Sequence, residues 1–122
     1  MNATRILIVD DSTTNNILLQ SILEEEGFHV DVAFSGKEAL TLVNKQTPSL
    51  ILLDIMMPEI DGISLLRQLQ ANAQTQAIPV VMVTAKDDEY SREESILAGA
   101  KDFLTKPIDV DLVIQKVKSL VN

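Results

Sequence analysis

Five short apolar runs, separated by helix-like stretches, constrain the fold of this chain more than any other feature. The runs are Ile6–Val9, Val30–Ala33, Leu50–Leu53, Val80–Val83 and Phe103–Thr105. Strands that alternate with helices at this spacing are typical of βαβ units, which build parallel sheets. The sequence therefore predicts an α/β protein with one domain over residues 1–122, with no internal repeat and no linker.

The composition of the runs indicates where each strand lies in the sheet. Ile6–Val9, Leu50–Leu53 and Val80–Val83 are apolar throughout, as expected of strands that are covered on both faces. The second run alternates and the fifth is short, so both fit sheet edges. With right-handed crossovers, the doubly wound, flavodoxin-like order 2-1-3-4-5 satisfies these constraints. The runs support this order without establishing it. Helices one and five would share one face, and helices two, three and four the other.

Helix boundaries are marked by capping residues. Ser35 with Glu38 three residues later is a capping box that begins the second helix. Asp61 and Asp109 are N-cap candidates for the third and fifth helices. The fourth helix has a charged entry, DDEYSREE, and little apolar content beyond residues 96–98. We expect a marginal, mobile helix there.

The charge balance excludes several classes of function. The chain has 10 Lys and Arg against 18 Asp and Glu, a net charge of −8. Nucleic-acid binding needs a basic surface that displaces counterions from phosphates, so neither it nor docking on anionic membranes is expected. There is no cysteine for disulfides, thiolate chemistry or metal binding. Because the sequence has no signal-peptide pattern and no apolar run near the ~20 residues of a membrane span, we expect a cytoplasmic protein.

Polar side chains stand where four of the predicted strands end. Asp10 and Asp11 follow the first strand, and Asp54 follows the third. Thr84 ends the fourth strand, and Lys106 follows the fifth. In open parallel sheets, ligands bind outside the carboxyl ends of the strands, where the strand order reverses. That point lies between strands one and three here, so these side chains are expected to converge.

Three neighbouring carboxylates, those of Asp10, Asp11 and Asp54, need a counter-charge. At ~4 Å and an effective dielectric constant of about 20, each pair of like charges costs about 4 kcal/mol. A hard divalent cation with oxygen ligands fits best, because no His or Cys lies nearby in the sequence. Mg²⁺ takes one or two carboxylates, keeps several waters and shares phosphate oxygens. The sequence therefore predicts Mg²⁺ and a phosphoryl group at one site.

Asp54 is the natural nucleophile of this group, because carboxylates form aspartyl-phosphates. Phosphoryl transfer needs mainly positioning and charge neutralisation, which Mg²⁺ and the Lys106 ammonium can supply. The Thr84 hydroxyl can donate to another phosphate oxygen. Taken singly, each residue also has a structural interpretation: an aspartate as a cap, Thr84 as a strand end, Lys106 as a solvated lysine. Their joint placement at one sheet edge favours the functional interpretation.

Four blocks of sequence resemble the response-regulator receiver domains of two-component signalling. They are ILIVDD at 6–11, LILLDIMMPEIDG at 50–62, VVMVTA at 80–85 and GAKDFLTKP at 99–107. Each block is moderately specific, and all four in this order and spacing are highly specific. The resemblance spans nearly the whole chain and implies a (βα)5 fold that works as a phosphorylation-operated switch.

The resemblance implies a role for each residue of the acidic group. Asp54 looks like the phosphoacceptor. Asp10 and Asp11 look like the acidic pair that holds Mg²⁺ together with Asp54, one of them directly and one partly through water. Met56 would add its backbone carbonyl to the metal, so the type of its side chain matters less there.

The resemblance also implies a switch. Thr84 looks like the hydroxyl that moves toward the phosphoryl group, and Phe103 occupies the aromatic position that swings inward behind it. Lys106 looks like the lysine that contacts the phosphoryl group, and a cis bond before Pro107 is common in the family. Phe103 stands where many members have tyrosine, which removes a hydroxyl that could bond a partner or the backbone. The face altered by the switch would be made by helix four, strand five and helix five.

The implied partners are a histidine kinase or a histidine phosphotransfer domain, and a downstream effector protein or a fused output domain. The main alternative is a Mg²⁺-dependent phosphatase or phosphotransferase that turns over small substrates on Asp54. Hydrolases of the haloacid dehalogenase type need a second Asp where this chain has Met56. A flavodoxin shares the fold, but Asp10 and Asp11 would repel its phosphate, and the first turn lacks the G-x-G-x-x-G of nicotinamide binding. We expect a switch that catalyses its own phosphorylation and dephosphorylation, and no turnover enzyme.

Overall fold

The computed structural model describes residues 4–121, and its centre is a parallel sheet of five strands. The strands are β1 (Arg5–Val9), β2 (His29–Ala33), β3 (Leu50–Leu53), β4 (Val80–Thr84) and β5 (Asp102–Thr105). They lie in the order β2-β1-β3-β4-β5, which confirms the predicted order. Several strands extend one residue beyond the predicted apolar run, because backbone pairing continues at polar residues, as at Arg5 with His29 and Thr84 with Thr105.

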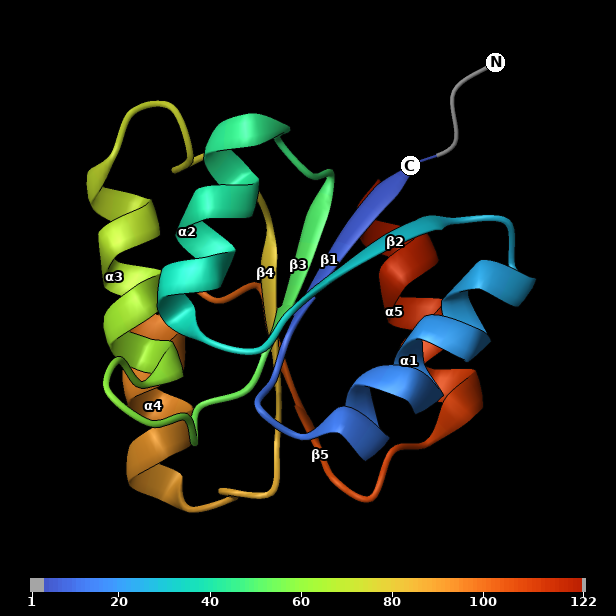
Figure 1. Ribbon diagram of the computed structural model, residues 1–122. Coiled ribbons are helices and arrows are strands. Elements are labelled where there is room, and N and C mark those ends of the chain that lie inside the picture. Colours follow the sequence, from blue (N-terminus) through green and yellow to red (C-terminus); the bar gives the residue numbers. More distant parts are fainter. Residues whose placement is uncertain (1–3, 122) are drawn as a thin grey trace.

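Five helices cover the two faces of the sheet (Figure 1). They are α1 (Thr13–Glu25), α2 (Gly36–Lys45), α3 (Gly62–Ala71), α4 (Glu89–Leu97) and α5 (Val110–Val121). Helices α1 and α5 lie on one face, and α2, α3 and α4 on the other, as predicted. Each face has its own apolar cluster, because successive side chains of a strand point to opposite faces. No helix within residues 4–121 is long and apolar enough to cross a membrane.

The predicted helix caps are confirmed by their hydrogen bonds. Ser35 accepts a hydrogen bond of 3.1 Å from the amide of Glu38 at the start of α2. Asp61 and Asp109 accept from the amide three residues later, at 2.9 and 3.1 Å, at the starts of α3 and α5. Ser12 caps α1 in the same way. These caps fix where each helix leaves the loop that follows a strand.

Helix α4 is packed differently from the other helices. Its buried residues are Ser91 and Ser95, whereas Leu97 is 82% exposed and Tyr90 is exposed as well. An ion pair between its Glu94 and a residue of α3 spans the gap between the two helices. The low apolar burial of this helix agrees with the expected low apolar content, and its marginal stability and mobility stay predictions.

Candidate functional site

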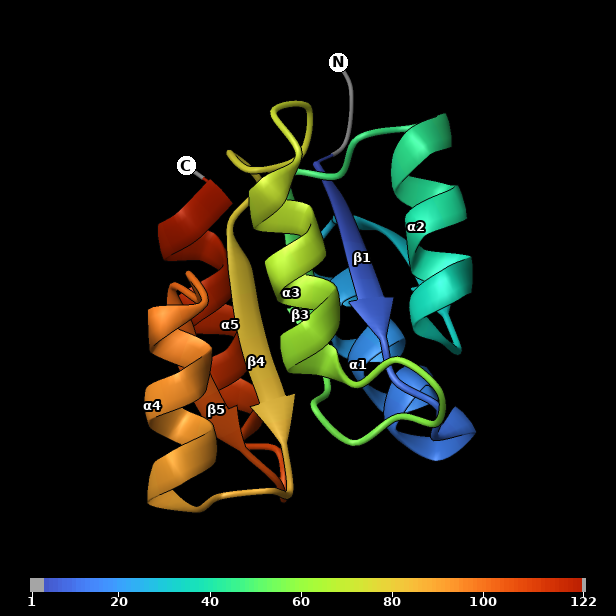
Figure 2. The same ribbon diagram turned by 90° about the vertical axis from the view of Figure 1, so that its left-hand side faces the viewer.

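The predicted site residues meet at the carboxyl edge of the sheet. The arrowheads of β1 and β4 point to the same end of the molecule in Figure 2, so residues that follow parallel strands gather there. Carboxylate oxygens of Asp10, Asp11 and Asp54 lie within 4.8 Å of one another. Asp10 is 3% exposed and Asp54 is 5% exposed, whereas Asp11 faces solvent. The predicted acidic cluster is therefore present, with two buried members and one exposed member.

Asp10 is held by the start of helix α1. Its Oδ1 accepts a hydrogen bond from the amide of Ser12 at 2.9 Å. Its backbone carbonyl accepts from Nδ2 of the buried Asn16 at 2.7 Å. Both the side chain and the backbone of Asp10 are thus fixed by the first turn of α1, while the next residue, Asp11, is exposed.

Asp54 is held by the end of β3 and by a close approach of α3. Its Oδ1 accepts from the amide of Met56 at 3.2 Å, and its own amide donates to the carbonyl of Val9 in β1 at 2.9 Å. Gly62, the first residue of α3, lies against this strand end. A Cβ at Gly62 would collide with the Asp54 carbonyl and lie only 2.8 Å from the Cα of Ile55. Glycine at this position therefore allows the helix to seat directly behind Asp54.

Lys106 bridges the two buried carboxylates. Its Nζ lies 2.7 Å from Oδ2 of Asp10 and 3.0 Å from Oδ2 of Asp54. Its amide donates to the carbonyl of Thr84 at 2.9 Å, which ties the end of β5 to the end of β4. The Lys106–Pro107 peptide bond is cis, as the resemblance implied. Lys106 is thus a half-buried pocket residue, with its side chain 14% exposed, and not a solvated surface lysine.

Burial and charge act against each other in this pocket. Burial raises the pKa of Asp10, and the opposing hydrogen bond from Lys106 does not cancel that effect. Burial also acts to lower the pKa of Lys106, but its hydrogen bonds to Asp10 and Asp54 outweigh this and raise it. Three ionised carboxylates and one ammonium sum to −2, so one divalent cation would neutralise the site. The all-oxygen donor set fits a hard cation such as Mg²⁺.

Of the two predicted switch residues, Thr84 ends β4 and Phe103 lies within β5. Thr84 is fully buried, and its hydroxyl oxygen accepts a hydrogen bond from the amide of Lys86 at 3.2 Å. Phe103 is 7% exposed and belongs to the apolar cluster on the face covered by α2, α3 and α4, and the guanidinium of Arg92 lies over its ring. The structure therefore holds Phe103 already buried. Whether its ring changes position with Thr84 stays a prediction.

Comparison with known proteins decides the family. The family model for the response regulator receiver domain matches residues 6–118. This chain belongs to the response regulator receiver domain family. The protein PilH of Pseudomonas aeruginosa is 39% identical over 117 residues, which cover 96% of this chain and 97% of PilH. The response regulator PleD of Caulobacter vibrioides is 42% identical over 118 residues, which cover 97% of this chain.

The extent of these matches differs between relatives. This receiver domain covers 26% of PleD, so it spans about a quarter of that relative's length. Among solved structures, the receiver domain of a signal transduction histidine kinase from Syntrophus aciditrophicus aligns with a TM-score of 0.91 at 38% identity, covering 98% of this chain and 90% of that one. The receiver domain of a Francisella response regulator aligns with a TM-score of 0.89 at 37% identity, covering 97% and 96%. These matches confirm the predicted receiver fold and its place in two-component signalling.

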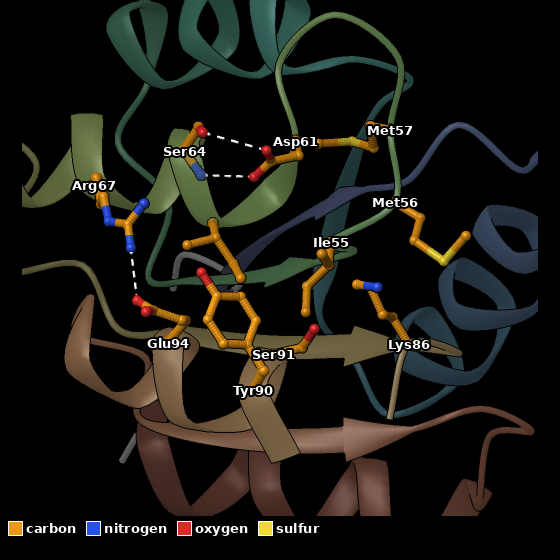
Figure 3. Close-up of a pocket in the computed structure, with 11 residues that line it drawn as sticks. Ile55, Met56, Met57, Asp61, Ser64, Arg67, Lys86, Tyr90, Ser91 and Glu94 are labelled. Carbon is orange, nitrogen blue, oxygen red and sulfur yellow. Dashed lines mark hydrogen bonds and ion pairs between the residues drawn. The ribbon is translucent and has the colours of Figure 1, made fainter. Parts of the chain in front are cut away.

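The receiver domain also has a groove beside the acidic cluster. It lies between α3 and α4, has a volume of about 360 Å³, and is lined by Met56 and Lys86 among others. Figure 3 shows Arg67 of α3 and Glu94 of α4 facing each other along it, joined by an ion pair of 2.8 Å. The lining of the groove includes neither Lys106 nor Asp10, Asp11 and Asp54, but it adjoins the acidic site through Met56.

Three residues that matter for the site were not predicted from the sequence. The side-chain amide of Asn16 donates a hydrogen bond to the carbonyl of Asp10. The sequence signal that could have indicated this role was a polar residue among the buried positions of α1. Gly62 ends one of the quoted sequence blocks, yet its contact with Asp54 depends on how α3 meets the sheet. Arg92 covers Phe103, and no sequence pattern indicated that contact.

Proposed function

We propose that this receiver domain is switched by transfer of a phosphoryl group to Asp54. The observation that carries the proposal is the Lys106 ammonium, which lies between the carboxylates of Asp10 and Asp54 at 2.7 and 3.0 Å. An ammonium at this position can contact an oxygen of a group attached to Asp54 without leaving the pocket. A third carboxylate nearby leaves the cluster short of positive charge.

Mg²⁺ is the proposed resident cation, held by the carboxylates of Asp10, Asp11 and Asp54 and by the backbone carbonyl of Met56. When bound, Mg²⁺ supplies the positive charge that lets a phosphoryl group approach an acidic pocket. The protein holds the carboxylates in position. Asp10 is fixed by the first turn of α1, and Asp54 is fixed by the amide of Met56 and the backbone of β1.

The transfer step is a displacement at phosphorus. A carboxylate oxygen of Asp54 forms the new P–O bond while the bond between phosphorus and the donor breaks, and the leaving group keeps that electron pair. With a phosphohistidine donor, the leaving group is an imidazole nitrogen. In this proposal Lys106 holds one phosphoryl oxygen, and the Thr84 hydroxyl donates to another.

The proposed consequence is a shift between two forms of the domain. Thr84 turns toward the phosphoryl oxygens, and the ring of Phe103 adjusts behind it, which alters the face made by α4, β5 and α5. A phosphoryl group can shift a two-state equilibrium only through a difference in its interaction with the two forms. Moving from 1:99 to 99:1 takes about 5.5 kcal/mol, within reach of a few charge-assisted hydrogen bonds of about 1.5–3 kcal/mol each.

The proposed donor is a histidine kinase or a histidine phosphotransfer domain, and the proposed recipient of the signal is an effector protein or a fused output domain. Apolar side chains on the proposed output face support a protein partner, since Leu97 and Ile96 of α4 and Leu112 of α5 are exposed. In this proposal the domain is a switch that is modified once per event, not an enzyme that turns over substrates.

The decisive experiment combines acetyl phosphate with Mg²⁺ and measures intact mass on the wild type and on Asp54→Asn. We expect a single phosphoryl adduct on the wild type, none on Asp54→Asn, and none on the wild type when Mg²⁺ is chelated. Free phosphate should be released at the rate at which the adduct decays. Many turnovers of small phosphate monoesters would instead indicate a phosphatase, and a wild type that gains no adduct would refute the proposal.

A further inference from the structure

Arg92 joins three parts of the receiver domain. It lies on α4, and its guanidinium carbon is 4.6 Å from the centre of the Phe103 ring on β5. The same guanidinium pairs with the carboxylate of Asp87, in the loop between β4 and α4. The Arg92 side chain is 47% exposed, whereas the ring that it covers is buried. It is thus a surface cation that rests on an aromatic face.

A short polar path leads from the acidic site to this contact. The hydroxyl oxygen of Thr84 accepts from the amide of Lys86 at 3.2 Å, which closes the first turn after β4. The next residue, Asp87, donates from its amide to the carbonyl of Ala85 at 3.0 Å and pairs through its side chain with Arg92. If the Thr84 hydroxyl turns away to a phosphoryl oxygen, the Lys86 amide loses this acceptor, and the turn that the hydrogen bond closes is released. Because Lys86 is exposed and water can replace the lost acceptor, the loop that carries Asp87 can then take a second position at small cost.

The chemistry of Phe103 explains why a guanidinium is favourable here. Phenylalanine has no hydroxyl, so its ring offers neighbours only a negative face and a positive edge. An arginine guanidinium stacks well on such a face and still donates hydrogen bonds in its plane. Arg92 does both, since it stacks on the ring and pairs with Asp87. The contact is therefore the link by which a movement of the loop can reach the ring.

We infer that Arg92 is the positioning residue that couples the loop after Thr84 to the ring of Phe103. The inference rests on the proposed function, because the movement begins when Thr84 meets a phosphoryl group. When the turn that the Thr84 hydroxyl closes moves, it displaces Asp87. Asp87 then displaces Arg92, and Arg92 displaces the Phe103 ring. The competing interpretation is that Arg92 and Asp87 form an ordinary solvated ion pair, which contributes little.

The test follows the Phe103 ring by aromatic NMR in wild type, Arg92→Gln and Arg92→Lys. The chain has 3 Phe and 1 Tyr, so its aromatic spectrum is simple, and Phe103→Leu identifies the signal. Each protein is measured with Mg²⁺ alone and with beryllofluoride added as a phosphoryl mimic. Arg67→Gln is the matched control, because Arg67 is also an arginine that ion-pairs at α4, through Glu94, and among the described residues it makes no cation–π contact with the Phe103 ring. Intact mass after acetyl phosphate reports on Asp54 in every variant.

We expect Arg92→Gln to gain the full Asp54 adduct while the beryllofluoride-induced change at the Phe103 ring falls below about half of the wild-type change. Arg92→Lys should lie between the two, because it keeps the charge and loses the planar group. Arg67→Gln should respond like wild type.

Two results would overturn the inference while the proposed function stands. One is a wild-type ring response in Arg92→Gln. The other is an equal loss in Arg67→Gln, which would show that any weakening of α4 has this effect. If the wild type itself gains no adduct and no ring response, the proposed function has failed and the coupling fails with it.

Discussion

Helices α3 and α4 cover the same face of the sheet and contact each other, yet they are attached to it in different ways. Helix α3 buries three leucines, Leu65, Leu66 and Leu69, against the strands. Helix α4 buries only serines and turns Leu97 and Tyr90 to solvent. Burying one leucine contributes roughly 1.5–3 kcal/mol relative to leaving it exposed. The anchoring of α3 is thus apolar and strong, and that of α4 is polar and weak.

This difference matches the position of each helix relative to the site. The first residue of α3, Gly62, lies directly behind Asp54, so α3 must stay in place for Asp54 to keep its position. Helix α4 is held by side-chain contacts at its surface, through Glu94 to α3 and through Arg92 to Phe103. A close-packed helix resists displacement, whereas one held by polar contacts can take a second position at small cost. We interpret α3 as support for the site and α4 as the element that reports its state.

The largest predicted difference between the two helices is in global stability. Leu66 is fully buried in α3, so Leu66→Ala should lower the free energy of unfolding by about 2–5 kcal/mol, through lost burial and a cavity. Leu97→Ala, on the exposed side of α4, should change it by less than about 0.5 kcal/mol. Urea denaturation of both variants measures the two values. Similar losses in the two variants would contradict the proposed contrast.

A second prediction concerns the support that α3 gives to Asp54. Gly62→Ala places a methyl group against the carbonyl of Asp54 and the backbone of Ile55, so α3 must move outward or the strand end must shift. We expect a loss of about 1–3 kcal/mol in unfolding free energy, as for an overpacked core. Phosphorylation by acetyl phosphate should also slow.

Gly36→Ala is the control for the loss of a helix-starting glycine. The three heavy atoms nearest to a Cβ at Gly36 would all belong to the side chain of Ile60, the closest at 3.1 Å, and none to the backbone. That variant should therefore keep the phosphorylation rate of the wild type. A Gly62→Ala variant that is phosphorylated at the normal rate would show that Asp54 does not depend on the seating of α3.

The fold and the acidic cluster were predictable because both follow from rules that act along the sequence. A strand that is apolar throughout has to lie inside a parallel sheet, which placed β1, β3 and β4 correctly. Carboxyl ends of parallel strands meet at one edge, which brought Asp10, Asp54 and Lys106 together from three separate strand ends. In both cases the prediction depends on a local sequence pattern, and the strand order then brings the residues together.

The contacts that were missed depend on distances between elements that no local pattern fixes. Asn16 shares the buried stripe of α1 with Leu19 and Leu23, and nothing in that stripe shows that its amide reaches a loop carbonyl. Arg92 sits in a run of charged residues that reads as a solvated face. Its contact with Phe103 depends on how α4 packs against β5. Contacts between side chains of one element and a second element are therefore the part of the site that the sequence did not predict and only the structure reveals.

A third, smaller prediction concerns the ion pair that joins the two helices. Arg67→Gln removes the 2.8 Å contact with Glu94, which is partly exposed to solvent, so the cost should be about 0.2–1 kcal/mol. The loss of stability should be confined to α4, because α3 remains anchored by its buried leucines. Hydrogen exchange should therefore quicken at amides of α4 and stay unchanged at those of α3. Equal changes in both helices would mean that they open as one unit.

The smallest predicted effect is a pH dependence confined to α4. Asp88 caps this helix, and the hydrogen bond from the amide of Ser91, 2.7 Å long, holds the pKa of Asp88 below its ordinary value. A carboxyl whose pKa is lowered on folding stabilises the folded form at pH above its ordinary pKa, and this stabilisation is lost as the pH falls through the lowered value. Acidification should therefore fray the start of α4 and shift the amide signal of Ser91 in NMR spectra. Asp88→Asn keeps a good N-cap without an ionisable group, so it should remove this pH dependence. A Ser91 amide that titrates identically in Asp88→Asn would assign the effect to another group and leave α4 anchored independently of its cap charge.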